Sequence, residues 1–131
     1  MTDLIPNDTE TTTVERKPIS PAQHAILDYS VAGVFLAVGF SLMRRHRGAS
    51  GLALLNGGMV LVMSMLTDYP GGIFRKLTFR THRTGDIIQA TLAAAGPALF
   101  GFAGDPEATY FYGQAVSEAG VIAATDWDAQ P

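Results

Sequence analysis

The chain has 131 residues, of which 47% are hydrophobic and only 16% are charged, whereas about a quarter of the residues in a typical soluble domain carry a charge. This length allows one domain, and the composition favours a domain embedded in lipid. The net charge of −3 argues against nucleic acid as a partner. Because the chain has no cysteine, disulfides, thiolate zinc sites, iron–sulfur clusters and cysteine nucleophiles are excluded.

Residues 1–20 are polar, rich in threonine and interrupted by proline. A segment of this composition buries too little apolar surface to fold by itself. We therefore expect a flexible tail over residues 1–20, followed by one membrane domain over residues 21–128. Acidic residues stand at the start of the tail, where a secretory signal would carry basic ones, so no signal peptide is predicted.

Four apolar segments rich in alanine, leucine and glycine follow, and their length and lack of alternation indicate helices and not strands. Ser20 is expected as the N-cap of the first, with Pro21 at the first helical position and Gln23 completing a capping box. The expected segments are Pro21 to Met43, Ser50 to Thr67, His82 to Phe102, and a last one capped by Asp105-Pro106-Glu107 that continues to about Thr125. Each has about 17–20 mainly apolar residues, which is enough to cross a bilayer. The sequence therefore predicts an all-helical bundle of four transmembrane helices.

An internal duplication becomes visible when the sequence is moved along itself by the 58 residues that separate His24 from His82. The superimposed residues are His24 and His82, Asp28 and Asp86, Thr67 and Thr125, Asp68 and Asp126, and the aromatic pair Tyr69 and Trp127. We infer two parallel helical-hairpin repeats, residues 24–69 and 82–127. Because a hairpin crosses the membrane twice, both repeats start from the same side, and the matched polar residues gather near one face.

The distribution of basic residues indicates which face this is. With both termini in the cytoplasm, the inner side carries six basic residues and the outer side three, and an excess of lysine and arginine marks the cytoplasmic side. The inner set is Arg16, Lys17, Arg75, Lys76, Arg80 and Arg83, and the outer set is Arg44, Arg45 and Arg47. Both termini are therefore expected to be cytoplasmic.

The stretches HAILDY, LTDYPGG, GPALFGFAGD and YGQAVSEAG, together with the duplicated H-x3-D, resemble the SPW-repeat family of small bacterial membrane proteins. The similarity covers most of the chain after residue 20. The Ser-Pro-Trp that names the family is replaced here by Gly96-Pro97-Ala98, and Val38-Gly39-Phe40 stands at the equivalent place in the first repeat. The resemblance implies an integral protein of the bacterial inner (plasma) membrane built from pairs of transmembrane helices, and it implies no established activity.

The duplicated histidine and aspartate are the main candidate site. Positions i and i+4 of a helix share one face, so His24, Asp28, His82 and Asp86 can converge as two imidazoles and two carboxylates, a tetrahedral set for zinc or another divalent ion. Asp68 and Asp126 would then orient the imidazoles. Otherwise they mark the interface between the repeats or pair with the nearby basic residues Arg75, Lys76, Arg80 and Arg83. The alternative is structural: the carboxylates complement the helix dipole and lock the hairpins together.

A second candidate is Glu118, which lies about seven residues inside the last segment, where an unpaired carboxylate is costly. Gln114, one turn earlier, and Asn56 on the second segment are its expected partners. Two interpretations are open. Glu118 relays protons or cations toward the aspartates, or it holds the hairpins together as a hydrogen-bonded acid.

No enzyme activity is predicted, because no serine has a histidine and a carboxylate in a recognisable order and no phosphate-binding glycine loop is present. The favoured function is a structural or interaction role in the membrane, and the alternative is metal or proton handling by the duplicated His-x3-Asp residues. Expected partners are the lipid bilayer, anionic head groups near the basic connections, and a second copy of the chain.

Overall fold

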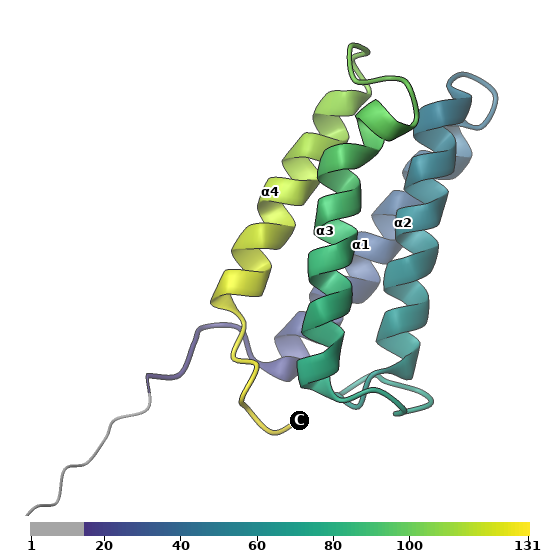
Figure 1. The fold of residues 1–131 in the computed structure, drawn as a ribbon. Helices are drawn as coiled ribbons and strands as arrows, with labels where there is room; N and C mark the ends of the chain where they lie inside the picture. The colour runs from purple at the N-terminus through teal and green to yellow at the C-terminus, as the bar shows by residue number, and fades with distance from the viewer. Residues whose placement is uncertain (1–14) are drawn as a thin grey trace, which may run out of the picture.

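The computed structural model describes residues 15–131, which form four helices and no strand (Figure 1). The helices are α1 (Pro21–Leu42), α2 (Arg47–Leu66), α3 (Phe79–Leu99) and α4 (Ala108–Ala124). They alternate in direction, so the C-terminus, the start of α1 and the α2–α3 connection share one end of the bundle, here called the terminal end (Figure 1). The α1–α2 and α3–α4 loops lie at the opposite, distal end. The expected all-helical architecture is thus confirmed.

Hydrogen bonds from side chains begin α1 and α3. Ser20 Oγ accepts from the Gln23 amide at 3.3 Å, and Gln23 Oε1 accepts from the Ser20 amide at 2.9 Å, which confirms the capping box at α1. Thr78 Oγ1 accepts from the Thr81 amide at 3.1 Å, so α3 begins three residues before the predicted His82.

The predicted cap of α4 is wrong. Glu107 precedes the helix without a side-chain hydrogen bond to it, because the Asp105 carboxylate lies instead 2.9 Å from Nε2 of His46 in the α1–α2 loop.

The predicted tail lies partly outside the described residues, and its last two residues belong to the fold. The Ile19 amide donates to the Ala124 carbonyl at 3.1 Å, and the Asp126 amide donates to the Ile19 carbonyl at 2.9 Å. These bonds place Ile19 beside Thr125, and Leu77, 58 residues later, lies in the same way beside Thr67. The backbone therefore repeats the sequence offset, and the boundary of the folded part moves from residue 21 to residue 19.

The core is divided between the two ends of the bundle. The distal half is filled by a cluster of buried residues that comprises Phe35, Ala49, Leu52, Ala53, Phe102, Ala108 and Phe111. The terminal end holds a second cluster of Ala25, Tyr69, Phe79 and Trp127. α1 packs along α2, α3 along α4 and α2 along α3, whereas α1 and α4 make few contacts.

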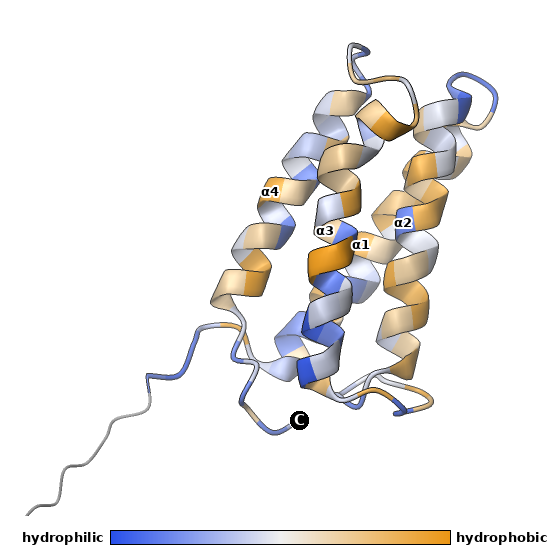
Figure 2. Ribbon diagram, viewed as in Figure 1, coloured by the Kyte–Doolittle hydropathy of each residue, from blue (hydrophilic) through white to orange (hydrophobic). Residues whose placement is uncertain are grey.

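α1 and α2 are long and apolar enough to cross a membrane. Only 28% of the apolar stretch of α1 and 44% of that of α2 are buried, so much of their hydrophobic surface points outward. Figure 2 shows hydrophobic residues along all four helices, with hydrophilic residues at the ends of the bundle and also at mid-height on α2, α3 and α4. The sequence predicts membrane crossing for all four helices. α3 does not reach the same hydropathy because its first two turns are polar, and α4 has only 17 residues.

Candidate functional site

Two histidines and two aspartates converge at the terminal end of the bundle. α1 contributes His24 and Asp28, and α3 contributes His82 and Asp86. One ligand atom from each lies within 4.8 Å of all the others. His24 Nε2 is 3.3 Å from Asp28 Oδ1 and 3.0 Å from Asp86 Oδ2, while His82 Nε2 is 3.1 Å from Asp28 Oδ2 and 2.9 Å from Asp86 Oδ1. These four residues, the His–Asp cluster, thus form a closed ring in which each histidine contacts both carboxylates.

Threonines at the ends of α2 and α4 orient the two imidazoles. Thr67 Oγ1 donates to the Met63 carbonyl at 2.7 Å and lies 2.7 Å from His82 Nδ1. Because the hydroxyl has a single proton and gives it to the carbonyl, Nδ1 must be the donor in the second bond. Thr125 Oγ1 repeats this arrangement with the Val121 carbonyl at 2.7 Å and His24 Nδ1 at 2.9 Å.

The orientation leaves both Nε2 atoms facing carboxylates. A neutral imidazole with its proton on Nδ1 presents a lone pair at Nε2, and that lone pair repels a carboxylate oxygen about 3 Å away. The cluster therefore requires positive charge at its centre, either as protons on the imidazoles or as a cation. Among the described residues, His82 Nε2 has no hydrogen-bond partner, although Asp28 Oδ2 and Asp86 Oδ1 lie 3.1 and 2.9 Å from it.

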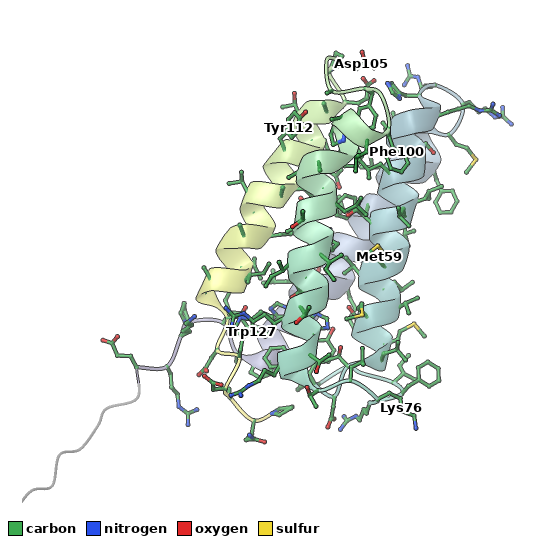
Figure 3. All side chains as sticks on the ribbon, viewed as in Figure 1. Met59, Lys76, Phe100, Asp105, Tyr112 and Trp127 are labelled. Atoms are coloured by element: carbon green, nitrogen blue, oxygen red, sulfur yellow. The ribbon has the colours of Figure 1, made fainter. Side chains whose placement is uncertain are left out.

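Aromatic rings close the terminal end over the cluster. The Trp127 ring centre lies 4.8 Å from those of His24 and Phe79, and the Tyr69 ring centre lies 5.4 Å from that of His82. In Figure 3, Trp127 lies at this end of the bundle, far from Asp105 and Phe100. His24 and His82 are consequently buried. The Tyr69 hydroxyl donates to Asp28 Oδ2 at 2.7 Å, and burial raises its pKa, so it remains a donor at neutral pH.

Asp68 and Asp126 do not contact the histidines, so the orienting role predicted for them belongs to the preceding threonines. Asp68 is exposed and lies 3.5 Å from Arg75, and Asp126 accepts from the Asp128 amide at 3.3 Å. The reason is geometric: a threonine at the helix end points into the bundle, and the next residue points outward.

Glu118 bonds directly to a residue that was not among its expected partners. Its Oε1 accepts from Gln89 Nε2 at 2.8 Å, and the same nitrogen lies 3.1 Å from Asn56 Oδ1. Asn56 Nδ2 in turn donates to the Leu52 carbonyl at 2.9 Å. Asn56 is therefore connected to Glu118 through Gln89, which was not among the predicted site residues. The signal was available, since residues 82, 86 and 89 share one helical face.

The residue types of the cluster, imidazole and carboxylate, are ligands that divalent first-row metal ions accept. Zinc binds imidazole nitrogen and carboxylate oxygen at about 2.0–2.2 Å, so the ligand atoms of a tetrahedral ion lie about 3.3–3.5 Å apart. The four candidate ligand atoms lie within 4.8 Å of one another, so binding an ion would draw them closer together. Two neutral imidazoles and two carboxylates would neutralise a charge of +2. The protonated Nδ1 atoms, each held by a threonine, are the usual outer partners of metal-bound histidines.

Comparisons of the chain with family models, with curated proteins and with solved structures find no match.

Proposed function

We propose that this chain is a small integral membrane protein whose two hairpins share a buried divalent-metal centre, the His–Asp cluster, near the cytoplasmic face. The main support for a metal ion is the environment of His82 Nε2. This atom is buried between two carboxylates and forms a hydrogen bond with neither of them. A cation at the centre of the ring satisfies both Nε2 lone pairs and both carboxylates at once. First-row ions such as zinc suit a mixed set of imidazole and carboxylate ligands.

Two features support the membrane location. α1 and α2 are about 30 Å long, and large apolar side chains are exposed along their outer faces. Exposed apolar surface of this kind is unfavourable in water and is typical of a surface that contacts lipid or another protein. Exposed apolar residues occur on α3 and α4 as well: the set over all four helices includes Ile26, Val34, Phe40, Leu55, Val62, Ile87, Ile88, Leu99 and Val116. The resemblance to SPW-repeat proteins of the bacterial inner membrane supports the same proposal from the sequence motifs.

The proposed orientation places the terminal end in the cytoplasm. Six basic residues accompany this end and three accompany the distal end, as the positive-inside rule favours. In Figure 3, Lys76 marks the basic connection between α2 and α3 at the terminal end. This connection would lie against anionic head groups of the inner leaflet.

Elemental analysis of the protein purified in detergent and loaded with zinc tests the metal centre. We expect one ion per chain in the native protein and in His46→Ala, which removes the one histidine outside the cluster. His24→Ala and His82→Ala are expected to lose the ion. Thr67→Val should keep it but bind it about 10–100-fold more weakly against a competing chelator, because the imidazole loses its outer partner. Zinc retained by the double variant without both cluster histidines, or absent from the native protein, contradicts the proposal.

Cysteine labelling tests the orientation, and the natural absence of cysteine makes single substitutions unambiguous. Gly104→Cys lies in the distal α3–α4 loop, where a Cβ atom has no neighbour within 4 Å. Gln130→Cys is exposed near the C-terminus. In spheroplasts, an impermeant maleimide should label Gly104→Cys directly and Gln130→Cys only after permeabilisation. The reverse pattern would invert the proposed topology, and equal labelling of both would refute it.

A structural lock is the second candidate function, favoured by the crossing of contacts between the hairpins. His24 of the first repeat bonds Thr125 of the second, and His82 of the second bonds Thr67 of the first. Two imidazolium ions and two carboxylates would hold the hairpins together without metal. The two candidates differ in one measurement: a chelator lowers the unfolding temperature of the metal protein and leaves that of the metal-free lock unchanged.

A further inference from the structure

The seam between α1 and α4 contains a cavity of about 80 Å³. Its inner walls are polar at two places, where the His–Asp cluster and the pair Gln89 and Glu118 reach it. The remaining walls are apolar and come from Leu27, Val31, Val60, Val121 and Ile122. α1 and α4 make few contacts, and Leu27 and Ser117 at the cavity are exposed, so the cavity opens sideways, out of the bundle.

The duplication supplies a reference for this seam. An offset of 58 residues relates the α4–α1 seam to the α2–α3 seam, which is packed. There, Gly85 lets α3 approach α2 so closely that an added Cβ atom would lie 2.4 Å from Met63 Cε. The residues equivalent to Gly85 and Met63 are Leu27 and Val121, and both line the cavity. Leucine and valine therefore stand at the open seam in the places where glycine and methionine make the close contact of the packed seam.

The same comparison singles out Glu118. The equivalent residue is Val60 of α2, so only the second repeat carries a carboxylate at this position. Glu118 is 8% exposed, and its Oε1 accepts a hydrogen bond from Gln89, whereas its Oε2 has no hydrogen-bond partner among residues 15–131. Neither α1 nor α4 contains a lysine or arginine, and the other ionisable groups that line the cavity, His24, Asp28 and Asp86, contact one another. Within the part of the chain that the structure describes, the Glu118 carboxylate therefore has no positive partner of its own.

We propose that the α1–α4 seam binds the head of an amphiphilic primary amine that enters from the bilayer, with the ammonium group on Glu118 Oε2 and the alkyl chain along Leu27, Val31 and Val121. The cavity admits an ammonium group with a few methylene groups, and the rest of the chain extends into the lipid. A buried charge is stable only when it is paired, and an ammonium ion supplies both the missing charge and the missing donor. The inference rests on the proposed membrane location, which brings the seam into contact with lipid, and does not depend on the metal.

Unfolding of the detergent-solubilised full chain, followed through its single tryptophan, tests the seam with octylamine as the probe. Octylamine is expected to raise the unfolding temperature of the native protein saturably, at concentrations where octanol and octanoate have no effect. Glu118→Gln should weaken the apparent affinity about tenfold or more, the usual size for a hydrogen bond to a charged group. Val121→Phe should abolish the effect by filling the cavity, and Val62→Phe, on the exposed face of α2, should leave it unchanged.

Three results would overturn the inference: equal responses to the three amphiphiles, an unchanged affinity in Glu118→Gln, or no response in the native protein. Equal responses that persist in Glu118→Gln would identify general detergent-like binding. The zinc content of the same samples separates the two proposals. A chain that binds octylamine without holding zinc contradicts only the metal centre, and a chain that holds zinc without binding octylamine contradicts only the seam site.

Discussion

His82→Ala is expected to lower the free energy of unfolding by about 3–5 kcal/mol, the usual cost of removing one partner of a buried charge cluster. The substitution leaves Asp28 and Asp86 facing each other with half of their positive partners removed, and it leaves the Thr67 hydroxyl oxygen without its imidazole donor. This expectation holds for a metal ion and for a pair of imidazolium ions, because either arrangement needs both rings. Equilibrium unfolding in detergent measures the change.

His46→Ala is the control for this prediction. His46 also contacts a carboxylate, Asp105, and caps α2 through the Ala49 amide, but it lies at the distal end. Loss of a cap lowers the free energy of unfolding by about 1 kcal/mol. His46→Ala should therefore destabilise the protein clearly less than His82→Ala does. Adding Asp86→Ala to His82→Ala should recover part of the lost stability, because the effects of substitutions at contacting residues on the free energy of unfolding are not additive. Equal costs for His82→Ala and His46→Ala would show that the cluster does not stabilise the fold.

Gly72→Ala is expected to destabilise the protein by about 3 kcal/mol, near the upper end of the range for overpacking. A Cβ atom at Gly72 would lie 1.8 Å from the Thr67 carbonyl oxygen, and a backbone oxygen cannot move aside as a side chain can. The turn has no freedom to adjust: the Gly72 amide donates to the Tyr69 carbonyl at 2.9 Å, and Gly71 has a φ of 100°, as a type II turn requires. The displaced residue is the threonine that orients His82, so zinc affinity should fall together with stability.

Gly58→Ala is the matched control, since it makes the same change inside α2, where an added Cβ atom meets nothing within 4 Å. Alanine is favoured over glycine within a helix by about 0.5–1 kcal/mol, so this variant should be as stable as the native protein or more so. A Gly72→Ala protein with native stability and native zinc affinity would show that the turn does not fix the position of Thr67.

The duplication made the meeting of His24, Asp28, His82 and Asp86 predictable, because one offset matched both pairs and a hairpin returns each to the same side. The offset identifies which residues are equivalent, and it says nothing about which of them touch. For that reason, the sequence predicted that Asp68 and Asp126 orient the imidazoles. In the structure, each histidine is instead hydrogen-bonded to a threonine of the opposite repeat. Gln89 was missed for a related reason: its equivalent is Val31, so it has no match in the duplication.

The number of helices was predictable from the four apolar segments, and their ends were less so. Thr78 starts α3 before the polar turn around His82, because a hydroxyl cap needs no apolar sequence around it. Asp105 has the composition of a cap, but a tertiary partner, His46, takes its carboxylate. Local patterns give a helix its approximate extent, and long-range contacts decide where it begins.

The exchange of partners between the repeats has a consequence for assembly. One hairpin alone holds a histidine and an aspartate but lacks the threonine that would orient its imidazole, so it cannot complete a half-site from its own residues. Two separate hairpins would have to find each other by diffusion in the plane of the membrane, and the fraction assembled would vary with their surface density. The short segment between residues 67 and 78 links the two hairpins covalently. Their association is therefore intramolecular, and the effective concentration of one hairpin near the other is fixed by the length of the segment. Covalent linkage thus makes completion of the centre independent of how abundantly the protein is produced.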